Sequence, residues 1–349
     1  MTCPCKTKPH CNYSTGIPNI NMNAQQICTQ LFSDKTKKKI DNLKNLKSEN
    51  EINKFRAVFK SGFLWPENKK ILRVAYINPN DSTSSDYERT VYYSNPFYDD
   101  NGNEIYLDPL QVKIDNERIP VTDAIKLIIE ERYNKFLGIK FNFDNVDDID
   151  NSDIRISFDP NGGSSSYVGT DCDDYYFKGK PTMNLGWFNV ATVLHEFGHA
   201  LGLIHEHQNP TSEIKWNTDY ICNYFSGPRN CWDPKTICTN ILDTQYPDSV
   251  LYTDFDPFSI MLYFFSARLT KDDKGTSQNV RLSGNDVIQL ARNYPGGKMT
   301  PEEFYKYAYN EDIADSLNVH GLRERVNRNM KYYVAIGMII IILVLILLL

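Results

Sequence analysis

The apolar positions of this chain repeat with a strand period in four short segments. Turn residues flank these segments, as is usual for strands. The predicted strands lie at 64–78, 139–143, 154–158 and 182–185, the last of them at a sheet edge. In the first segment the apolar residues that mark the strand are Ile71, Val74 and Tyr76.

Helical spacing of apolar residues appears in two longer segments. One runs from Thr122, a possible N-cap, through Phe136 to a stop at Gly138. Its apolar face consists of Ala124, Ile125, Ile128, Ile129 and Tyr133. The other covers 187–201, with a buried stripe of Val190, Val193, Leu194 and Phe197. A last, shorter helix is predicted over 285–293.

The order of these elements predicts the fold class. Strands, a helix, more strands and a second helix favour an α+β fold, in which a twisted mixed α/β sheet packs on two long helices. Hydrophobic residues make up 41% of the 349-residue chain, enough for a packed core. We expect four regions: a polar N-terminal appendage at 1–55, the main domain at 56–297, a charged stalk at 298–331 and an apolar end at 332–349.

The apolar end, YYVAIGMIIIILVLILLL, carries no charge. As a helix it would be about 27 Å long, which just spans a bilayer. A buried core helix is the alternative, but such a helix normally shows polar positions at helical spacing. We therefore predict a transmembrane tail anchor. The basic residues before it and the lack of a visible signal peptide predict that the main domain faces the cytosol, or the inside of a virion if the source is viral.

The charge and the cysteine content exclude few functions. The chain has 38 basic and 44 acidic residues, so no basic field favours nucleic acid. Its eight cysteines divide evenly between the appendage and the main domain: Cys3, Cys5, Cys11 and Cys28, then Cys172, Cys222, Cys231 and Cys238. An even number suggests disulfides, whereas a cytosolic location favours free thiols, and both alternatives stay open.

The histidines point to metal chemistry. Four of the six lie in HEFGHALGLIHEH, residues 195–207. His195 and His199 are one helical turn apart, so both imidazoles project from one face. Gly202 permits a left-handed turn that brings His205 up as a third zinc ligand. Three neutral nitrogens with one exchangeable position are typical of catalytic rather than structural zinc.

Glu196, beside the first ligand, is the natural general base. Its carboxylate can reach a water at the metal and take a proton from it during attack on a peptide carbonyl. Metal binding by the CPC start, and latency through a cysteine thiolate on the zinc, are less favoured alternatives.

The zinc motif and the later FDPFSIMLYFF resemble the motif and Met-turn of the metzincins, and the nearest branch is the astacin-like M12 metallopeptidases. The resemblance covers residues 60–297, including LWPENKKILRVAYIN, SDIRISF and LSGNDVIQLARNYPG. It implies a metzincin catalytic domain with Met261 beneath the ligands and Tyr263 as a second catalytic residue, which ligates zinc at rest and stabilises the oxyanion. Leu262 stands where the family usually has His, and His207 is expected behind the ligands rather than on the metal.

These features predict a membrane-anchored zinc endopeptidase that cleaves proteins or peptides in extended form along the edge strand at 182–185. The alternative is a membrane or virion structural protein that keeps a zinc-binding metzincin fold for interaction. Substrate choice depends on the weakly patterned loops of residues 208–254.

Overall fold

The fold is seen in a computed structural model. It describes residues 4–5, 28–38, 63–77, 97–98, 104–105, 111–114, 117–159, 162–173, 179–227, 231–243, 254–300 and 303. The predicted anchor at 332–349 lies outside these residues, as does most of the stalk. Across the described ranges, no helix is long and apolar enough to cross a membrane.

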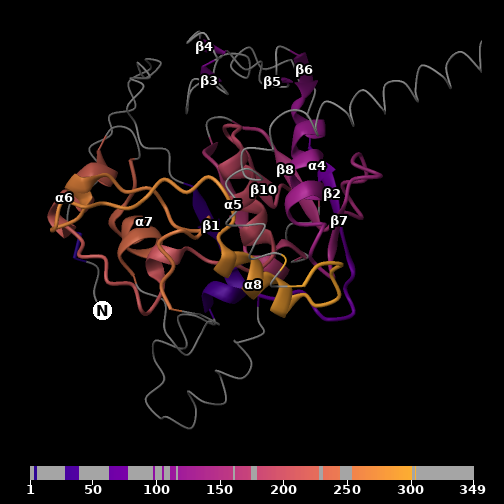
Figure 1. Cartoon of the computed structure of the whole chain (residues 1–349). Coiled ribbons are helices and arrows are strands. Elements are labelled where there is room, and N and C mark those ends of the chain that lie inside the picture. Colours follow the sequence, from indigo (N-terminus) through magenta and orange to yellow (C-terminus); the bar gives the residue numbers. More distant parts are fainter. Residues whose placement is uncertain are drawn as a thin grey trace, which may run out of the picture.

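A six-stranded mixed sheet supports the molecule, with α5 near the centre of the view and α4 beside β2 and β8 (Figure 1). The strands lie in the order β1-β9-β10-β8-β2-β7. Their bounds are β1 Thr29–Leu31, β2 Ile71–Tyr76, β7 Lys140–Asn142, β8 Ile154–Ser157, β9 Ser165–Tyr167 and β10 Met183–Asn184. β2 is parallel to both β7 and β8, and β10 is parallel to β8.

One sequence prediction about the sheet is wrong. The segment predicted as an edge strand, 182–185, contains β10, which pairs on both sides: Met183 lies opposite Ile156 in β8 and opposite Ser166 in β9. The strand beyond it, β9, is antiparallel to β10 and consists of the polar residues SSY. The sequence analysis predicts no strand here because β9 lacks apolar alternation.

The first predicted strand is present, with a different buried face. Ile71 is 51% exposed, whereas Leu72 and Val74 are buried, as is Tyr76. Side chains two residues apart share a face of a strand, so the core-facing set is 72, 74 and 76. The predicted strands at 139–143 and 154–158 are confirmed as β7 and β8.

The helices pack against the sheet through a large apolar core. Helix α4 spans Val121–Arg132, beginning before the predicted cap Thr122. Helix α5 spans Val190–Ala200. Tyr133, just after α4, donates a hydrogen bond to Leu194 O at 2.7 Å, and Phe197 meets Phe141 edge to face with ring centroids 4.9 Å apart. These contacts hold α5 firmly on the sheet.

The last helix, α8, spans Gly284–Asn293 and begins with a capping box formed by Ser283 and Asp286. Its C-terminal end lies close to the chain that follows α4. A Cβ on Gly138 would lie 1.8 Å from Pro295 O, so only glycine fits there. Gly138 therefore serves close packing between the two segments.

A second apolar cluster includes residues of 221–225 and 237–242, from the segments that lie at the left of Figure 1. The segment after the third histidine had been predicted as loops, yet it forms α6 Thr218–Ser226, α7 Pro234–Ile237 and a π-helix, η5 Cys238–Leu242. Ile221, Phe225 and Ile237 are fully buried in this cluster. Such short helices lack enough helical periods to be recognised from apolar spacing.

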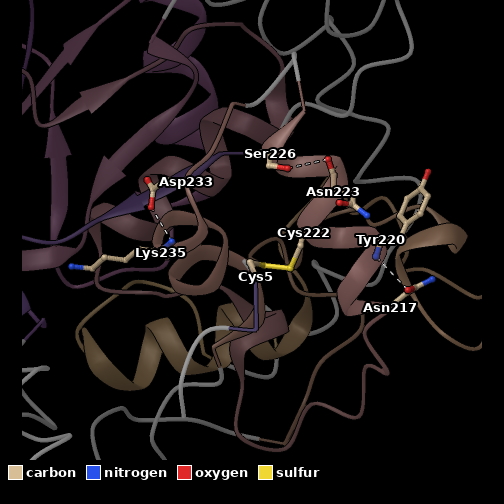
Figure 2. The surroundings of a disulfide bond; sticks show 8 residues. All are labelled: Cys5, Asn217, Tyr220, Cys222, Asn223, Ser226, Asp233 and Lys235. Carbon is tan, nitrogen blue, oxygen red and sulfur yellow. Dashed lines mark hydrogen bonds between the residues drawn. A yellow bond between two sulfur atoms is a disulfide. The ribbon is translucent and has the colours of Figure 1, made fainter. Parts of the chain in front are cut away.

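Cysteines link this cluster to the N-terminal part of the chain. A disulfide joins Cys5 to Cys222 in α6, as Figure 2 shows. Cys231 and Cys238 are also disulfide-bonded, whereas Cys28 and Cys172 are buried free thiols. The chain thus contains both kinds of cysteine that its sequence left open.

The remaining elements of the described part of the chain are short. Two small antiparallel pairs precede α4, and 3₁₀ helices connect the larger elements. Their bounds are β3 Phe97–Tyr98, β4 Glu104–Ile105, β5 Gln111–Ile114, β6 Glu117–Pro120, η2 Gly169–Asp173, η4 Glu206–Gln208 and η6 Ala267–Leu269.

Candidate metal centre

Helix α5 carries the first two candidate ligands. Its N-cap, Asn189, accepts a hydrogen bond from Thr192 N at 2.7 Å, which fixes where the helix begins. His195 and His199 then lie one turn apart and project into the same buried space, with ring centroids 4.7 Å apart. Both side chains are at least 95% buried.

The end of α5 redirects the chain as predicted. Gly202 has φ +93°, the left-handed region that favours glycine. Its N–H donates to His199 O at 2.8 Å, and Leu203 N–H donates to Gly198 O at 3.0 Å, the two bonds of a Schellman motif. This turn sends the chain back so that His205, fully buried, faces His199.

The three histidines converge on one point. Nε2 of His199 lies 3.1 Å from Nε2 of His205, and ligand atoms of all three histidines lie within 4.8 Å of one another. Two nitrogens on a tetrahedral zinc are about 3.3 Å apart, given Zn–N bonds of about 2.0–2.1 Å. The observed spacing fits a zinc ion held by His195, His199 and His205.

Backbone carbonyls orient the first two rings. Nδ1 of His195 lies 2.9 Å from Ile260 O, and Nδ1 of His199 lies 2.8 Å from Leu203 O. A carbonyl can only accept, so each Nδ1 carries the hydrogen and each Nε2 keeps its lone pair for a metal. Nε2 of His195 is buried and has no hydrogen-bond partner among the described residues, as expected of an atom that binds an ion.

Burial keeps these imidazoles neutral. It lowers the pKa of His195 to about 4 and holds the pKa values of His199 and His205 well below the usual value. Neighbouring histidines add to the effect for the latter two. Neutral imidazole is the form that binds zinc, so the site is ready for metal at neutral pH.

The Met-turn forms the floor of the site. Ile260, whose carbonyl orients His195, is held by its N–H, which donates to Asp286 at 2.8 Å. Glu206, next to the third ligand, donates its N–H to Met261 O and accepts from Asp256 N at 2.8 Å. Helix α8 and the third-ligand segment thus fix the turn from two sides.

Met261 lies directly against α5. A Cβ on Gly198 would lie 2.6 Å from Met261 Sδ, closer than real contacts allow. We expect Gly198→Ala to lower the free energy of unfolding by about 1–3 kcal/mol, since Met261 must move. Urea unfolding of the zinc-loaded chain measures this. In a double-mutant cycle the cost should shrink when Met261→Ala is also present, and equal costs in both backgrounds would contradict the contact.

Glu196 lies next to His195 and forms a second close group with His195 and Cys28, apart from the three histidines. It is fully buried, and burial raises its pKa to about 8. A nearby divalent cation would favour the ionised carboxylate and bring the pKa down again. A carboxyl group with a displaced pKa beside a metal centre is suited to accept and return a proton.

Tyr263 reaches the same centre from the Met-turn side. Its hydroxyl lies 2.6 Å from Nε2 of His205 and donates to the backbone carbonyl of Cys28. Burial raises its pKa well above the usual value, so the phenol stays protonated. His207 stacks behind His205 and Tyr263, and its Nε2 lies 2.8 Å from Asn240 O.

Two residues that the sequence had not placed at the metal centre also reach it. Cys28 Sγ lies within 4.8 Å of ligand atoms of His195 and Glu196. Gln30 accepts a hydrogen bond from His205 N at 3.2 Å. Both had been predicted to belong to the N-terminal appendage. The stretch ICTQLF around them, with apolar residues on either side, was the available signal.

Comparison with known proteins finds one family model and solved structures of peptidases. The family model Astacin, peptidase family M12 (subfamily A), matches residues 122–294, from α4 to α8. A solved structure of myroilysin is 27% identical, with a TM-score of 0.50 over 67% of this chain and 97% of its own. The hatching enzyme HCE-1, a zinc-protease from the medaka fish Oryzias latipes, is 13% identical over 66% of this chain and 94% of its own, with a TM-score of 0.37. No curated protein matches.

Three converging histidines on a helix–turn frame, above a methionine turn, define a zinc peptidase of the metzincin class, a peptide-bond hydrolase. The match to the family model covers every one of these elements. The chain belongs to the astacin family of peptidases.

Proposed function

We propose that this astacin-family endopeptidase uses Glu196 as general base and Tyr263 as the donor to the oxyanion. The observation that supports this most directly is the placement of Glu196, fully buried and one residue from a zinc ligand that it does not replace. Tyr263 supports it as well, because its hydroxyl lies 2.6 Å from Nε2 of His205 and already donates to a backbone carbonyl, that of Cys28.

The proposed reaction follows from these positions. Zinc, when bound, supplies Lewis acidity and lowers the pKa of water to about 7. Glu196 accepts a proton from the attacking water and passes it to the leaving amine. Tyr263, kept protonated by burial, donates a hydrogen bond to the carbonyl oxygen as that oxygen gains negative charge.

An extended substrate would add to the sheet at β9, in place of the predicted edge at 182–185. β10 pairs with one side of β9 and β1 with the other, so the second side becomes available to a substrate once β1 is set aside. Main-chain hydrogen bonds to such an edge bind a peptide whatever its sequence. A cleavage profile on a peptide library would show which substrate side chains the site selects.

The test of this function uses the full chain. Metal analysis should find one zinc per chain, and casein should be cut after limited trypsin treatment that opens residues 39–62, which are rich in lysine. A chelator such as 1,10-phenanthroline should stop the cleavage, and added zinc should restore it. Bound zinc with no cleavage of casein or of a broad peptide library, before or after trypsin, would refute the endopeptidase function.

We also propose that residues 332–349 anchor the chain in a membrane, on the strength of their uncharged apolar sequence. The basic flank favours a cytosolic or virion-interior domain, whereas the Cys5–Cys222 disulfide is of a kind that persists in oxidising compartments. Alkaline extraction should leave the full chain in the membrane and release residues 1–331. Protease protection of intact membranes then decides the side.

A further inference from the structure

The third candidate ligand differs from the other two in what orients its ring. Backbone carbonyls face Nδ1 of His195 and Nδ1 of His199, whereas Nδ1 of His205 is buried and has no hydrogen-bond partner among the described residues. A histidine on a metal almost always donates its second ring nitrogen to a carbonyl, a carboxylate or a water. His205 therefore needs another support to keep its Nε2 directed at the point shared by the three histidines.

The ring of His207 provides a contact of this kind. The imidazoles of His205 and His207 stack with ring centroids 5.2 Å apart and an angle of 23° between their planes. The same ring stacks on Tyr263 at 4.8 Å and 29°. Offset stacking at such distances is attractive and favours one relative orientation of the rings, without any hydrogen bond between them. His207 thus contacts both the third ligand and the proposed oxyanion donor.

The ring of His207 is itself held firmly. The side chain is 3% exposed, and its Nε2 lies 2.8 Å from Asn240 O. Because a carbonyl can only accept, Nε2 carries the hydrogen. Phe265 and Trp216 lie at steep angles to the imidazole, with ring centroids 5.1 and 6.0 Å from its own. The hydrogen bond and the two aromatic contacts fix the imidazole in one orientation.

The carbonyl that accepts from His207 belongs to an uncommon kind of helix. η5 is a π-helix, a form that is rare in proteins and is frequent at functional sites. Thr239 O in this helix and Asp243 O at its end accept from Gln208 Nε2 at 2.7 and 2.8 Å. Three carbonyls of η5 and its C-cap therefore hold two consecutive residues that follow the third ligand closely.

We propose that His207 is a positioning residue for the third zinc ligand. Its ring, held by η5, keeps His205 oriented toward the metal by stacking, and it aligns Tyr263 through the second stacking contact. The part that concerns Tyr263 rests on the proposed function, whereas the part that concerns His205 is about metal binding alone. Loss of the ring frees the His205 side chain to rotate, so zinc binds more weakly. Loss of the hydrogen bond alone destabilises the fold and leaves the stacking ring in place.

Two substitutions separate the ring of His207 from its hydrogen bond. His207→Gln removes the ring and places an amide nitrogen near the position of Nε2, where it donates to Asn240 O. His207→Phe keeps a planar ring and removes the donor. The zinc Kd of the full chain is measured by competition with a chelator of known affinity. Stability is measured as the urea midpoint of the metal-free chain.

His207→Gln should raise the zinc Kd about 10–100-fold, the usual cost of losing a group that orients a metal ligand. His207→Phe should keep the Kd of the unchanged chain and lower the urea midpoint, because Asn240 O loses its donor. Phe225→Leu is the control. Phe225 is fully buried in the second apolar cluster and stacks on Trp232 at 5.1 Å, so this variant should lower the midpoint and leave the zinc Kd unchanged.

An unchanged zinc Kd in His207→Gln would overturn the proposal. So would an equal rise of the Kd in His207→Gln, His207→Phe and Phe225→Leu, because any loss of stability would then weaken zinc binding. If His207→Gln does not fold, His207→Leu is compared with His207→Phe. Both lack the donor and only His207→Leu lacks the ring, so the proposal requires the higher Kd for His207→Leu, and equal values would contradict it.

Peptide cleavage is measured on the same proteins after trypsin treatment, with the zinc sites filled. His207→Gln should lower kcat with KM little changed, because Tyr263 loses the ring on which it stacks. An unchanged kcat would overturn the part of the proposal that concerns Tyr263. If even the unchanged chain cuts neither casein nor a peptide library, the endopeptidase function fails, and the zinc Kd values still decide whether His207 positions His205.

Discussion

Glu196→Gln is expected to lower kcat about 10²–10⁴-fold, the usual contribution of a positioned general base. Glutamine has nearly the same shape and is also uncharged, as the buried carboxyl is when protonated, so the packing around α5 should hold. It cannot accept the proton of the attacking water. Zinc content should stay at one ion per chain, because the histidines are the ligands.

The measurement compares kcat and KM on a fluorogenic peptide after the same activating trypsin treatment of each protein. A fall in kcat with KM little changed marks an interaction made in the transition state. Glu131→Gln, a carboxylate on α4 that pairs with Lys135, is the control and should leave kcat unchanged. Loss of zinc from Glu196→Gln, or full activity, would refute the assigned role.

Tyr263→Phe should lower kcat about 10²–10³-fold, the typical cost of removing one donor to an oxyanion. The aromatic ring would remain, with its contacts to His205 and His207 at centroid distances of 4.2 and 4.8 Å. Only the hydroxyl is lost. Zinc binding should therefore change little, whereas the urea midpoint should fall slightly, because the carbonyl of Cys28 loses its donor.

Tyr76→Phe provides the matched control, since its hydroxyl also donates to a backbone carbonyl, Thr122 O at 3.0 Å, far along the chain from the site. It should keep full kcat. The two variants are assayed side by side after activation. If Tyr263→Phe cleaves as fast as Tyr76→Phe, Tyr263 is a core aromatic and the oxyanion donor must be sought elsewhere.

The zinc ligands were predictable because their spacing translates directly into geometry. His195 and His199 share a helix face, and Gly202 can adopt φ +93°, so three residues and one turn specify the site. The core-facing positions of α4 and α5 were likewise visible from apolar spacing. Residue spacing was enough to predict these features because the interacting residues are close together in the sequence.

The segment that contains β1 was missed for the opposite reason. The fold brings Cys28 close to His195, although the two residues are far apart in the sequence. In addition, β1 and β9 have three residues each, too few to show a strand period. Their pairing joins Thr29 to Ser165, a contact that no local pattern encodes. For the same reason the sequence did not reveal that β9 lies outside β10, and 182–185 was predicted as the outer strand.

The disulfide between Cys5 and Cys222 determines whether the two products of a cut in the chain separate. Cys5 precedes β1 and Cys222 follows the zinc ligands, so a cut within residues 39–62 leaves two polypeptides joined by a covalent bond. The severed segment would stay at an effective concentration of roughly millimolar, unaffected by dilution. After proteolysis alone, β1 could then pair with β9 again, and the thiol–disulfide balance of the surroundings would decide whether β1 leaves the sheet for good.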